Sequence, residues 1–298
     1  MDFVLQWGVD LIKIIQTIRM PALDHLMKAI SASGNYTFYL MMIPLFYWCV
    51  DKRNAIRLFY LFLFSTWLNS VTKDMLDQPR PFDLDESIRV GRTGGPGLPS
   101  GHAQGALVFW GYLALWARKR WFSATCIAII MLIAFSRLYL GVHFPTDLLG
   151  GWFLGLVLLL PFNYLANRFE ARLPSIPVSW LITAGTLLPI AMAFIFPSRW
   201  SVSPMGITAG FTLAIILEKK HIGLGAAKNF LNGLGRFIIG IAGLFGTLLG
   251  FKALMVKEAW WHLPAVFTQY YLIGLWIGFC APFVFKKLGL DDSHTGET

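Results

Sequence analysis

The sequence predicts an all-α protein whose helices form a polytopic membrane bundle. Hydrophobic residues make up 56% of the 298 positions and charged residues only 14%, whereas a soluble domain is roughly a quarter charged. Several apolar runs approach or exceed the roughly 20 residues that a helix needs to cross the hydrocarbon core. These runs are continuously apolar rather than alternating, which excludes a transmembrane β-barrel.

The N-terminal segment predicts a helix that lies in the membrane interface. Apolar residues recur on one face of residues 3–19, and Asp10 and Lys13 interrupt the run. Pro21 ends this helix, and residues 22–30 form a second short one. Nine spanning helices follow as the best count, with eight or ten as alternatives. We expect them at 33–50, 55–72, 102–117, 121–139, 147–167, 177–196, 200–217, 234–254 and 264–285.

Lysine and arginine cluster on every second connection between the expected spans. Such clusters mark the cytoplasmic side, so the stretch 73–101 and the loop 140–146 share the outer side. The same parity places Lys13, Arg19 and Lys28 outside, against the usual bias. This distribution accounts for the net charge of +9, and no basic surface domain remains to bind nucleic acid.

The remaining composition points away from a disulfide-bonded or secreted protein. Cys49, Cys126 and Cys280 all lie in apolar runs, where we expect small buried hydrophobic side chains rather than disulfides or a zinc site. The N-terminus has no basic region of the kind that begins a cleaved signal peptide.

The first polar constellation is "KDMLDQPRP", residues 73–81. Lys73 and Arg80, each taken alone, fit cations that extend from a span end toward water. Pro79 and Pro81, however, restrict the backbone around Arg80. A guanidinium held in this way suits bidentate phosphate binding.

The second constellation is "GGPGLPSGHAQG", residues 94–105. Ser100 fits a helix N-cap. The same turn offers the Ser100 hydroxyl and the Gly101 backbone N–H to an anion. His102 then stands in the first turn and faces the same place, although an isolated histidine at a membrane boundary is often incidental.

The third constellation is "SRLYLGVHFPTD", residues 136–147. Pro145 suits a first helical turn, which puts His143 just before the helix and Asp147 inside that turn. A carboxylate bound to one ring nitrogen fixes the tautomer and leaves the other nitrogen as a base or nucleophile. The simpler alternative is an aspartate at a helix dipole beside an arginine, Arg137, that reaches toward water.

The three constellations share one inferred membrane side, and residues 177–287 carry no comparable polar cluster. Ionisable groups near membrane depth are costly and usually functional. Three cations and two histidines around helix N-termini therefore predict an oxyanion site.

The spacings Lys-x6-Arg-Pro, Pro-Ser-Gly-His and Ser-Arg-x5-His-x3-Asp resemble the motifs of the type 2 phosphatidic acid phosphatase (PAP2) superfamily. The resemblance covers residues 30–167, and the segment before "GNYTFYL" is similar to the bacterial integral-membrane branch, with some likeness to sphingosine-phosphate phosphatases. The matching residues are Lys73, Arg80, Pro81, Pro99, Ser100, Gly101, His102, Ser136, Arg137, His143 and Asp147.

The resemblance implies a phosphatase that uses no metal and no cofactor. By position, His143 would attack phosphorus to form a phosphohistidine and Asp147 would orient it. His102 would protonate the leaving oxygen and then activate water. The implied phosphate ligands are Lys73, Arg80, Ser100, Gly101 and Arg137.

The implied organisation has four parts, with the catalytic core at 33–168. Residues 1–32 form the interfacial segment, 177–287 add further spans, and 288–298 form a polar tail. We expect a bacterial inner-membrane protein whose site faces the periplasm, and the oligomeric state stays open. An acidic loop beside the site reads as solvated, with a metal as the weaker alternative. Its residues are Asp74, Asp77, Asp83, Asp85 and Glu86.

The expected substrate is a lipid phosphate or diphosphate that arrives laterally in the membrane. Phe82, Tyr139 and Phe144 either line the approach of its tail or form an ordinary interfacial belt. Two other functions remain open: a phosphotransferase that passes the phosphoryl group to an acceptor hydroxyl, and a non-enzymatic anion transporter or channel.

Overall fold

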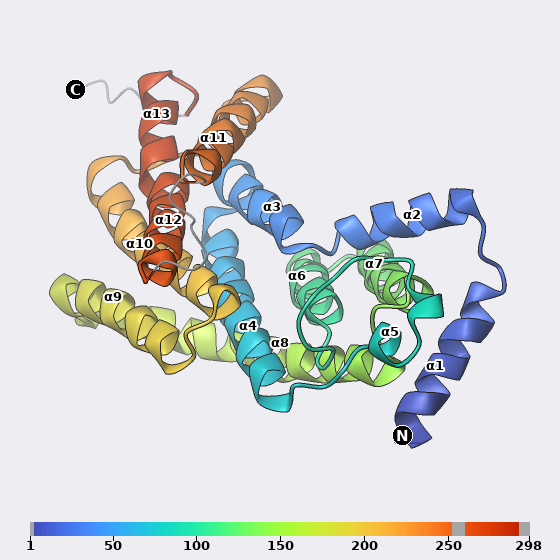
Figure 1. Cartoon of the computed structure of the whole chain (residues 1–298). Coiled ribbons are helices and arrows are strands. Elements are labelled where there is room, and N and C mark those ends of the chain that lie inside the picture. The colour runs from blue at the N-terminus through green and yellow to red at the C-terminus, as the bar shows by residue number, and fades with distance from the viewer. Residues whose placement is uncertain (1–2, 252–259, 292–298) are drawn as a thin grey trace, which may run out of the picture. The chain divides into compact units, whose positions relative to one another are not determined.

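Helices account for all the regular structure in the part of the chain that is described, residues 3–251 and 260–291 of a computed structural model. The fold is all-α, as the sequence predicts (Figure 1). The first helices are α1 (Phe3–Gln16), α2 (Pro21–Ala32), α3 (Tyr36–Cys49), α4 (Lys52–Leu76), α5 (Pro81–Leu84), η1 (Glu86–Ile88), α6 (Gly101–Ala117), α7 (Arg120–Tyr139) and α8 (Pro145–Arg172). The later ones are η2 (Leu173–Ser175), α9 (Val178–Ile195), α10 (Arg199–His221), α11 (Phe230–Gly250), α12 (His262–Leu275), η4 (Trp276–Cys280) and α13 (Ala281–Lys287).

Each expected span coincides with a helix, although the end of the span predicted at 234–254 lies outside the described residues. Among the described residues, six helices are long and apolar enough to cross a membrane. The helices α3 and α6 are shorter, with 14 and 17 residues, and α4 falls outside the set by composition. The six make this chain an integral membrane protein. They are Arg120–Tyr139, Pro145–Ser175, Val178–Ile195, Trp200–His221, Phe230–Gly250 and His262–Lys287.

The chain divides into two compact units. One comprises residues 1–40 and 68–165, and the other residues 41–67 and 166–298. Every candidate site residue lies in the first unit. The four-part division expected from the sequence stays a prediction.

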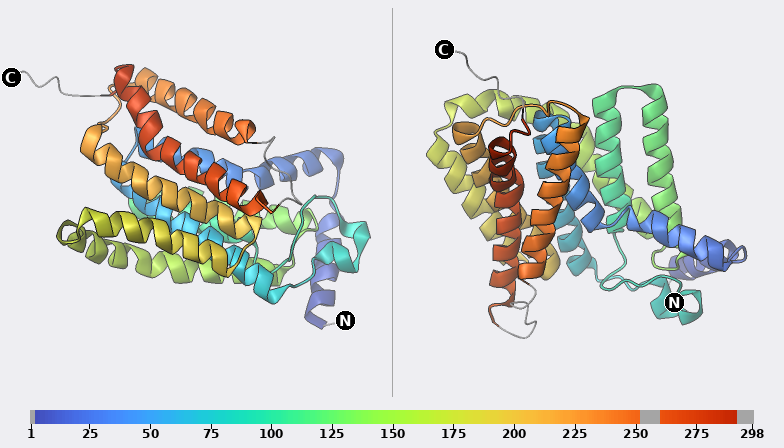
Figure 2. Two further views of the ribbon diagram at one scale, coloured as in Figure 1. Left: turned by 60° about the vertical axis from the view of Figure 1, so that its left-hand side comes forward. Right: turned by 90° about the horizontal axis from the view of Figure 1, so that it is seen from above.

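The N-terminal helices are part of the first unit. In it α6 and α7 pack side by side, and α2 lies against α7 (Figures 1 and 2). Val9 and Ile12 of α1 are buried against Ile88 and Phe144. Lys13 Nζ lies 2.7 Å from Asp85 Oδ2. The amphipathic helix therefore sits beside the loop that precedes α6, in agreement with the parity of the spans.

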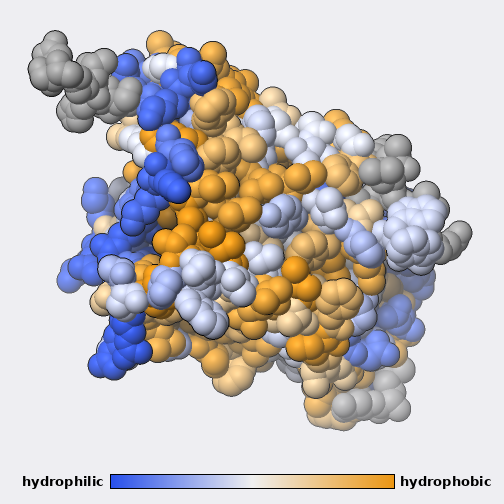
Figure 3. Space-filling view, turned by 90° about the vertical axis from the view of Figure 1, so that its left-hand side faces the viewer, coloured by the Kyte–Doolittle hydropathy of each residue, from blue (hydrophilic) through white to orange (hydrophobic). Residues whose placement is uncertain are grey.

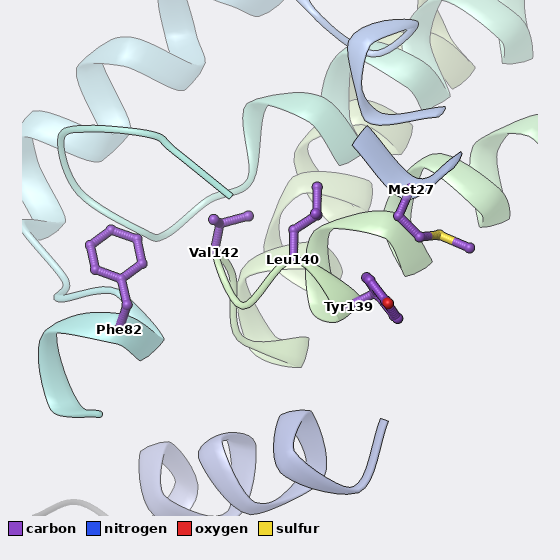
Figure 4. Close-up of a cluster of buried hydrophobic side chains, with 5 residues drawn as sticks. All are labelled: Met27, Phe82, Tyr139, Leu140 and Val142. Atoms are coloured by element: carbon purple, nitrogen blue, oxygen red, sulfur yellow. The ribbon is translucent and has the colours of Figure 1, made fainter. Parts of the chain in front are cut away.

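A buried cluster joins α2, α5 and the loop after α7 (Figure 4). Phe82, Tyr139 and Phe144 are only 8%, 0% and 1% exposed, so the expectation that they line a lipid path or an interfacial belt is wrong. Each side chain packs in a core instead, because helices α1 and α2 cover it. The cluster in Figure 4 consists of Met27, Phe82, Tyr139, Leu140 and Val142.

The second unit contains buried charges that the sequence analysis did not anticipate. Glu218 is fully buried and its Oε2 lies 2.6 Å from Lys52 Nζ. Arg236, also fully buried, donates to four backbone carbonyls, at Trp48, Gly225, Ala226 and Leu290. The stretch 177–287, which the sequence analysis treats as apolar spans with basic flanks, thus also holds two buried charged side chains. Burying a charge in an apolar unit costs desolvation free energy, and this cost is offset here because each group is ion-paired or hydrogen-bonded.

Apolar side chains dominate the outer surface of the spanning helices. Phe194 is 76% exposed and Trp200 71%. Figure 3 shows hydrophobic residues over most of the face drawn, with hydrophilic ones gathered near its margin. Such a surface suits contact with lipid tails.

Candidate active site

The loop between α7 and α8 delivers His143 to the site. Gly141 has φ +67°, and a Cβ there would lie 2.0 Å from the carbonyl oxygen of Ile88. Only glycine tolerates both conditions. The chain then turns into α8 at Pro145, so His143 stands just before the helix and Asp147 in its first turn, as the sequence predicts.

His143 and Asp147 form a buried pair. The Nδ1 atom of His143 lies 3.0 Å from Asp147 Oδ2, and that oxygen also accepts from the backbone N–H of Phe144 at 2.9 Å. The other carboxylate oxygen, Oδ1, accepts from Gln78 Nε2 at 2.8 Å. Three donors thus hold the carboxylate in one orientation against the imidazole.

The tautomer of His143 follows from its second neighbour. Arg80 Nη1 lies 3.3 Å from His143 Nε2. Because a guanidinium can only donate, Nε2 must carry a lone pair and Nδ1 the proton that Asp147 accepts. Burial, followed by the charges of Arg80, Arg137 and Lys73, holds the pKa of His143 well below its ordinary value. At neutral pH the ring is therefore neutral, and its unprotonated Nε2 can act as a nucleophile.

The second motif forms the start of α6. Ser100 is the N-cap, and its hydroxyl accepts from the backbone N–H of Ala103 at 3.4 Å. Its own N–H donates to the carbonyl of Asp147 at 2.8 Å. Behind this turn, Asn69 Nδ2 donates to Gln104 Oε1 at 2.7 Å. The simple capping interpretation of Ser100 is thus correct, and the cap is held directly against the first turn of α8.

His102 and Arg137 meet residues from the other end of the unit. Nε2 of His102 lies 2.8 Å from Asn35 Oδ1, and Arg137 Nη1 donates to Ser31 Oγ. Within the described part of the chain, the buried Nε of Arg137 has no hydrogen-bond partner. The structure thus links Arg80, His143 and Asp147 by direct contacts, while His102 and Arg137 are bound to residues that precede α3.

Lys73 and Arg80 are directed at the loop before α6. Lys73 Nζ donates to the carbonyls of Pro96 and Gly97 at 2.6 and 2.9 Å. The guanidinium of Arg80 donates to the carbonyls of the 94–96 segment and of Val142 at 2.7–3.1 Å. Both cations thus order the loop that leads to Ser100.

The acidic loop is largely solvated, as expected: Asp74, Asp77, Asp83 and Glu86 are exposed and Asp85 is half-buried. Asp83 accepts from the backbone N–H of Arg80 at 2.8 Å. The hydrogen bond from Lys13 is the largest cause that lowers the pKa of Asp85 to about 2. Over the described ranges, no group of three or more His, Cys, Asp or Glu side chains could hold a metal ion.

Sequence reasoning missed four polar residues of the site: Gln78, Asn35, Ser31 and Asn69. Gln78 lies inside the first motif, two residues before Arg80, so the sequence already placed a polar amide side chain beside a predicted site residue. Asn35 and Ser31 are 67 and 106 residues from the groups they contact, and no local spacing reveals such pairs.

Comparison with known proteins decides the family. The family model described as the PAP2 superfamily matches residues 38–171. "Phosphatidylglycerophosphatase B" of Bacillus subtilis (strain 168) is 30% identical over 173 residues, which are 52% of this chain and 79% of that protein. This chain belongs to the PAP2 superfamily.

The likeness extends beyond the PAP2 core. A second family model, PAP2 superfamily phosphatase, transmembrane extension, matches residues 202–293. "Lipid phosphate phosphatase delta" of Arabidopsis thaliana is 26% identical over 295 residues, covering 87% of this chain and 68% of that protein. The crystal structure of the PAP2-type phosphatidylglycerolphosphate phosphatase of Bacillus subtilis superposes with a TM-score of 0.50 at 26% identity, over 56% of this chain and 88% of that one. These relatives support a membrane lipid phosphatase.

Proposed function

We propose that this PAP2 protein hydrolyses a lipid phosphomonoester or diphosphate through a phosphohistidine at His143, without a metal ion. The observation that carries the proposal is the buried pair of His143 and Asp147. It presents a neutral imidazole whose free nitrogen faces Arg80. A nucleophile oriented by a carboxylate and surrounded by cations suits attack on an anionic phosphoryl group.

Two displacement steps complete the reaction. In the first, the Nε2 lone pair of His143 attacks phosphorus, the bond from phosphorus to the lipid oxygen breaks, and His102, as an imidazolium, gives its Nε2 proton to that oxygen and becomes neutral. Asp147 compensates the positive charge that develops on His143. In the second, a water oxygen attacks phosphorus, the N–P bond breaks, and His102 takes the proton of the water.

The phosphoryl oxygens need donors, and the first unit supplies several. The buried Nε of Arg137 is one. The Ser100 hydroxyl and the Gly101 N–H at the start of α6 are others. Lys73 and Arg80 join them by exchanging some of their bonds to the 94–97 carbonyls for bonds to phosphate. Charge-assisted bonds of this kind are about twice as strong as neutral ones.

The proposed substrates are amphiphilic, since the machinery lies in a unit with apolar spanning helices. Relatives act, by name, on phosphatidylglycerophosphate and on lipid phosphates. The panel to test is undecaprenyl diphosphate, phosphatidylglycerophosphate, phosphatidate and a sphingoid-base phosphate. We place the site on the outer face of a bacterial inner membrane, because the basic clusters alternate with the site loops.

The test is phosphate release by the purified full chain in detergent with EDTA, without an added acceptor. We expect His143→Ala and His102→Ala each to lose at least about a hundredfold in turnover. His25, exposed on α2, supplies the control variant His25→Ala, which should keep full activity. With radiolabelled substrate, an acid-labile label should form on the wild-type chain and not on His143→Ala.

Three results would reject the proposal. The first is near-wild-type turnover in His143→Ala, and the second is loss of activity in EDTA, which would favour a metal. The third is phosphate release only when an acceptor alcohol is present, which would favour a phosphotransferase.

A further inference from the structure

The turn between α2 and α3 reaches into the site from outside the matched PAP2 core. Residues 31–35 precede the region 38–171 that the family model covers. Ser31 Oγ accepts from Arg137, Asn35 Oδ1 lies 2.8 Å from His102 Nε2, and Gly34 lies against the His102 ring. Three contacts from the end of α2 and the turn after it thus meet two of the residues that the motifs supply.

The contact with Asn35 sets the proton of His102. An amide oxygen only accepts, so Nε2 of His102 donates and carries the proton. Nε2 therefore carries a proton before substrate arrives, in the neutral ring and in the imidazolium alike. The general acid is the imidazolium, which returns to a neutral ring when it gives up the Nε2 proton.

Gly34 brings the turn close enough for this bond. A Cβ at position 34 would lie 2.7 Å from Ile133 Cγ2 and 3.0 Å from His102 Cδ2. Any larger residue would therefore push the turn away from α7 and the imidazole.

We propose that Asn35 is a positioning residue for His102, which holds the imidazole toward the phosphoryl site and keeps its proton on Nε2. This inference rests on the proposed function, because it assigns to His102 the transfer of a proton to the leaving oxygen. In the substrate complex the leaving oxygen shares that proton with the Asn35 amide oxygen, so the ring stays held while the proton is transferred. The PAP2 motifs alone then do not complete the site, and the N-terminal segment supplies the missing part.

The charges around His102 determine how a substitution at position 35 should change its protonation. Lys73 on α4, Arg80 before α5 and Arg137 on α7 all act on His102. His143 lies close enough to sense His102, and Asp147 on α8 is bound to His143. The charges that act on His102 are thus positive. A carboxylate at position 35 would place a negative charge directly on Nε2 and would favour the protonated ring.

The experiment compares Asn35→Ala, Asn35→Asp and Ser33→Ala in the full chain in detergent. Ser33 lies in the same turn but donates to the carbonyl of Ile30 at 2.7 Å, so Ser33→Ala is the matched control. We expect Asn35→Ala to lower kcat about tenfold, the upper effect of one hydrogen bond, with KM within about threefold. We expect Asn35→Asp to move the alkaline limb of the kcat–pH profile upward by about one pH unit or more. Ser33→Ala should change neither.

The outcomes separate this inference from the proposed function. Wild-type kcat and pH profile in both Asn35 variants would overturn the inference, and so would an equal loss in Ser33→Ala. A lowered melting temperature in any of the three variants would identify a loss of activity caused by unfolding. Asn35→Asp keeps a hydrogen-bond acceptor for His102, so it tests the role of the contact without removing it. Full activity in His143→Ala and His102→Ala would instead reject the proposed function, whatever the Asn35 variants do.

Discussion

Gly151 on α8 controls how closely the start of α6 approaches the His143–Asp147 pair. A Cβ at position 151 would lie 2.5 Å from the carbonyl oxygen of Ser100 and 3.2 Å from the backbone N of Gln104. Ordinary contact begins near 3.4 Å, so Gly151→Ala requires a shift of about 0.9 Å (3.4 − 2.5). The obstacle is backbone rather than a flexible side chain, so α6 as a whole has to move.

That shift would lower the catalytic rate more than the stability of the fold. Ser100, Gly101 and His102 all sit on the first turn of α6 and would move away from His143 together. A misplacement of about 1 Å can cost about a hundredfold in rate, while overpacking costs roughly 1–3 kcal/mol of stability. We therefore expect Gly151→Ala to lose about a hundredfold in kcat and to remain folded.

Two other helical glycines calibrate the effect. At Gly155 a Cβ would meet the flexible end of Leu107 at 2.6 Å, and at Gly246 on α11 it would meet nothing within 4 Å. Phosphate release and the melting temperature in detergent are measured for the three alanine variants. The order of activity should be Gly246→Ala, then Gly155→Ala, then Gly151→Ala. Near-wild-type kcat in Gly151→Ala, or an equal loss in Gly246→Ala, would refute the reasoning.

Two further predictions concern the His143–Asp147 pair. The folded pKa of His143 is held well below its ordinary value of about 6.5 by burial and nearby cations. Protonation removes the Nε2 lone pair, so the acid limb of the kcat/KM–pH profile should be centred below pH 6.5. An acid limb centred above pH 6.5 would contradict this assignment. Gln78→Met removes one of the three donors to Asp147 and should lower kcat about tenfold, as expected for a bond to a charged group, with KM little changed; an unchanged kcat would show that the other two donors suffice.

The fold class was accessible from sequence because it depends on local properties. Continuous apolar runs predict spanning helices wherever the chain can satisfy its backbone only within a helix. Proline and serine at helix starts act within one turn, which is why Pro145 and Ser100 were placed correctly. The bond from His143 to Asp147, four residues apart across a helix start, is local in the same sense.

Errors arose where burial depends on distant partners. Phe82 and Tyr139 looked like interfacial aromatics, yet both belong to a buried cluster built from segments far apart in the chain. Arg236 lies in an apolar run with no polar neighbour in the sequence, and its partners come from residues 48, 225, 226 and 290. A side chain's burial is a property of all the helices around it, and a window along the chain contains only one of them.

By itself, the sequence determined that this chain spans a membrane and carries two histidines, an aspartate and three cations at the ends of its spans. Residue type, periodicity and spacing are sufficient for that, because helix formation and membrane insertion respond to each segment separately. Only the tertiary structure decided which atoms those groups face. Arg80 meets His143 and the 94–96 carbonyls, and Asn35 meets His102. Hydrogen bonds require atoms within about 3 Å of one another, and helix packing alone sets such distances between residues far apart in the chain.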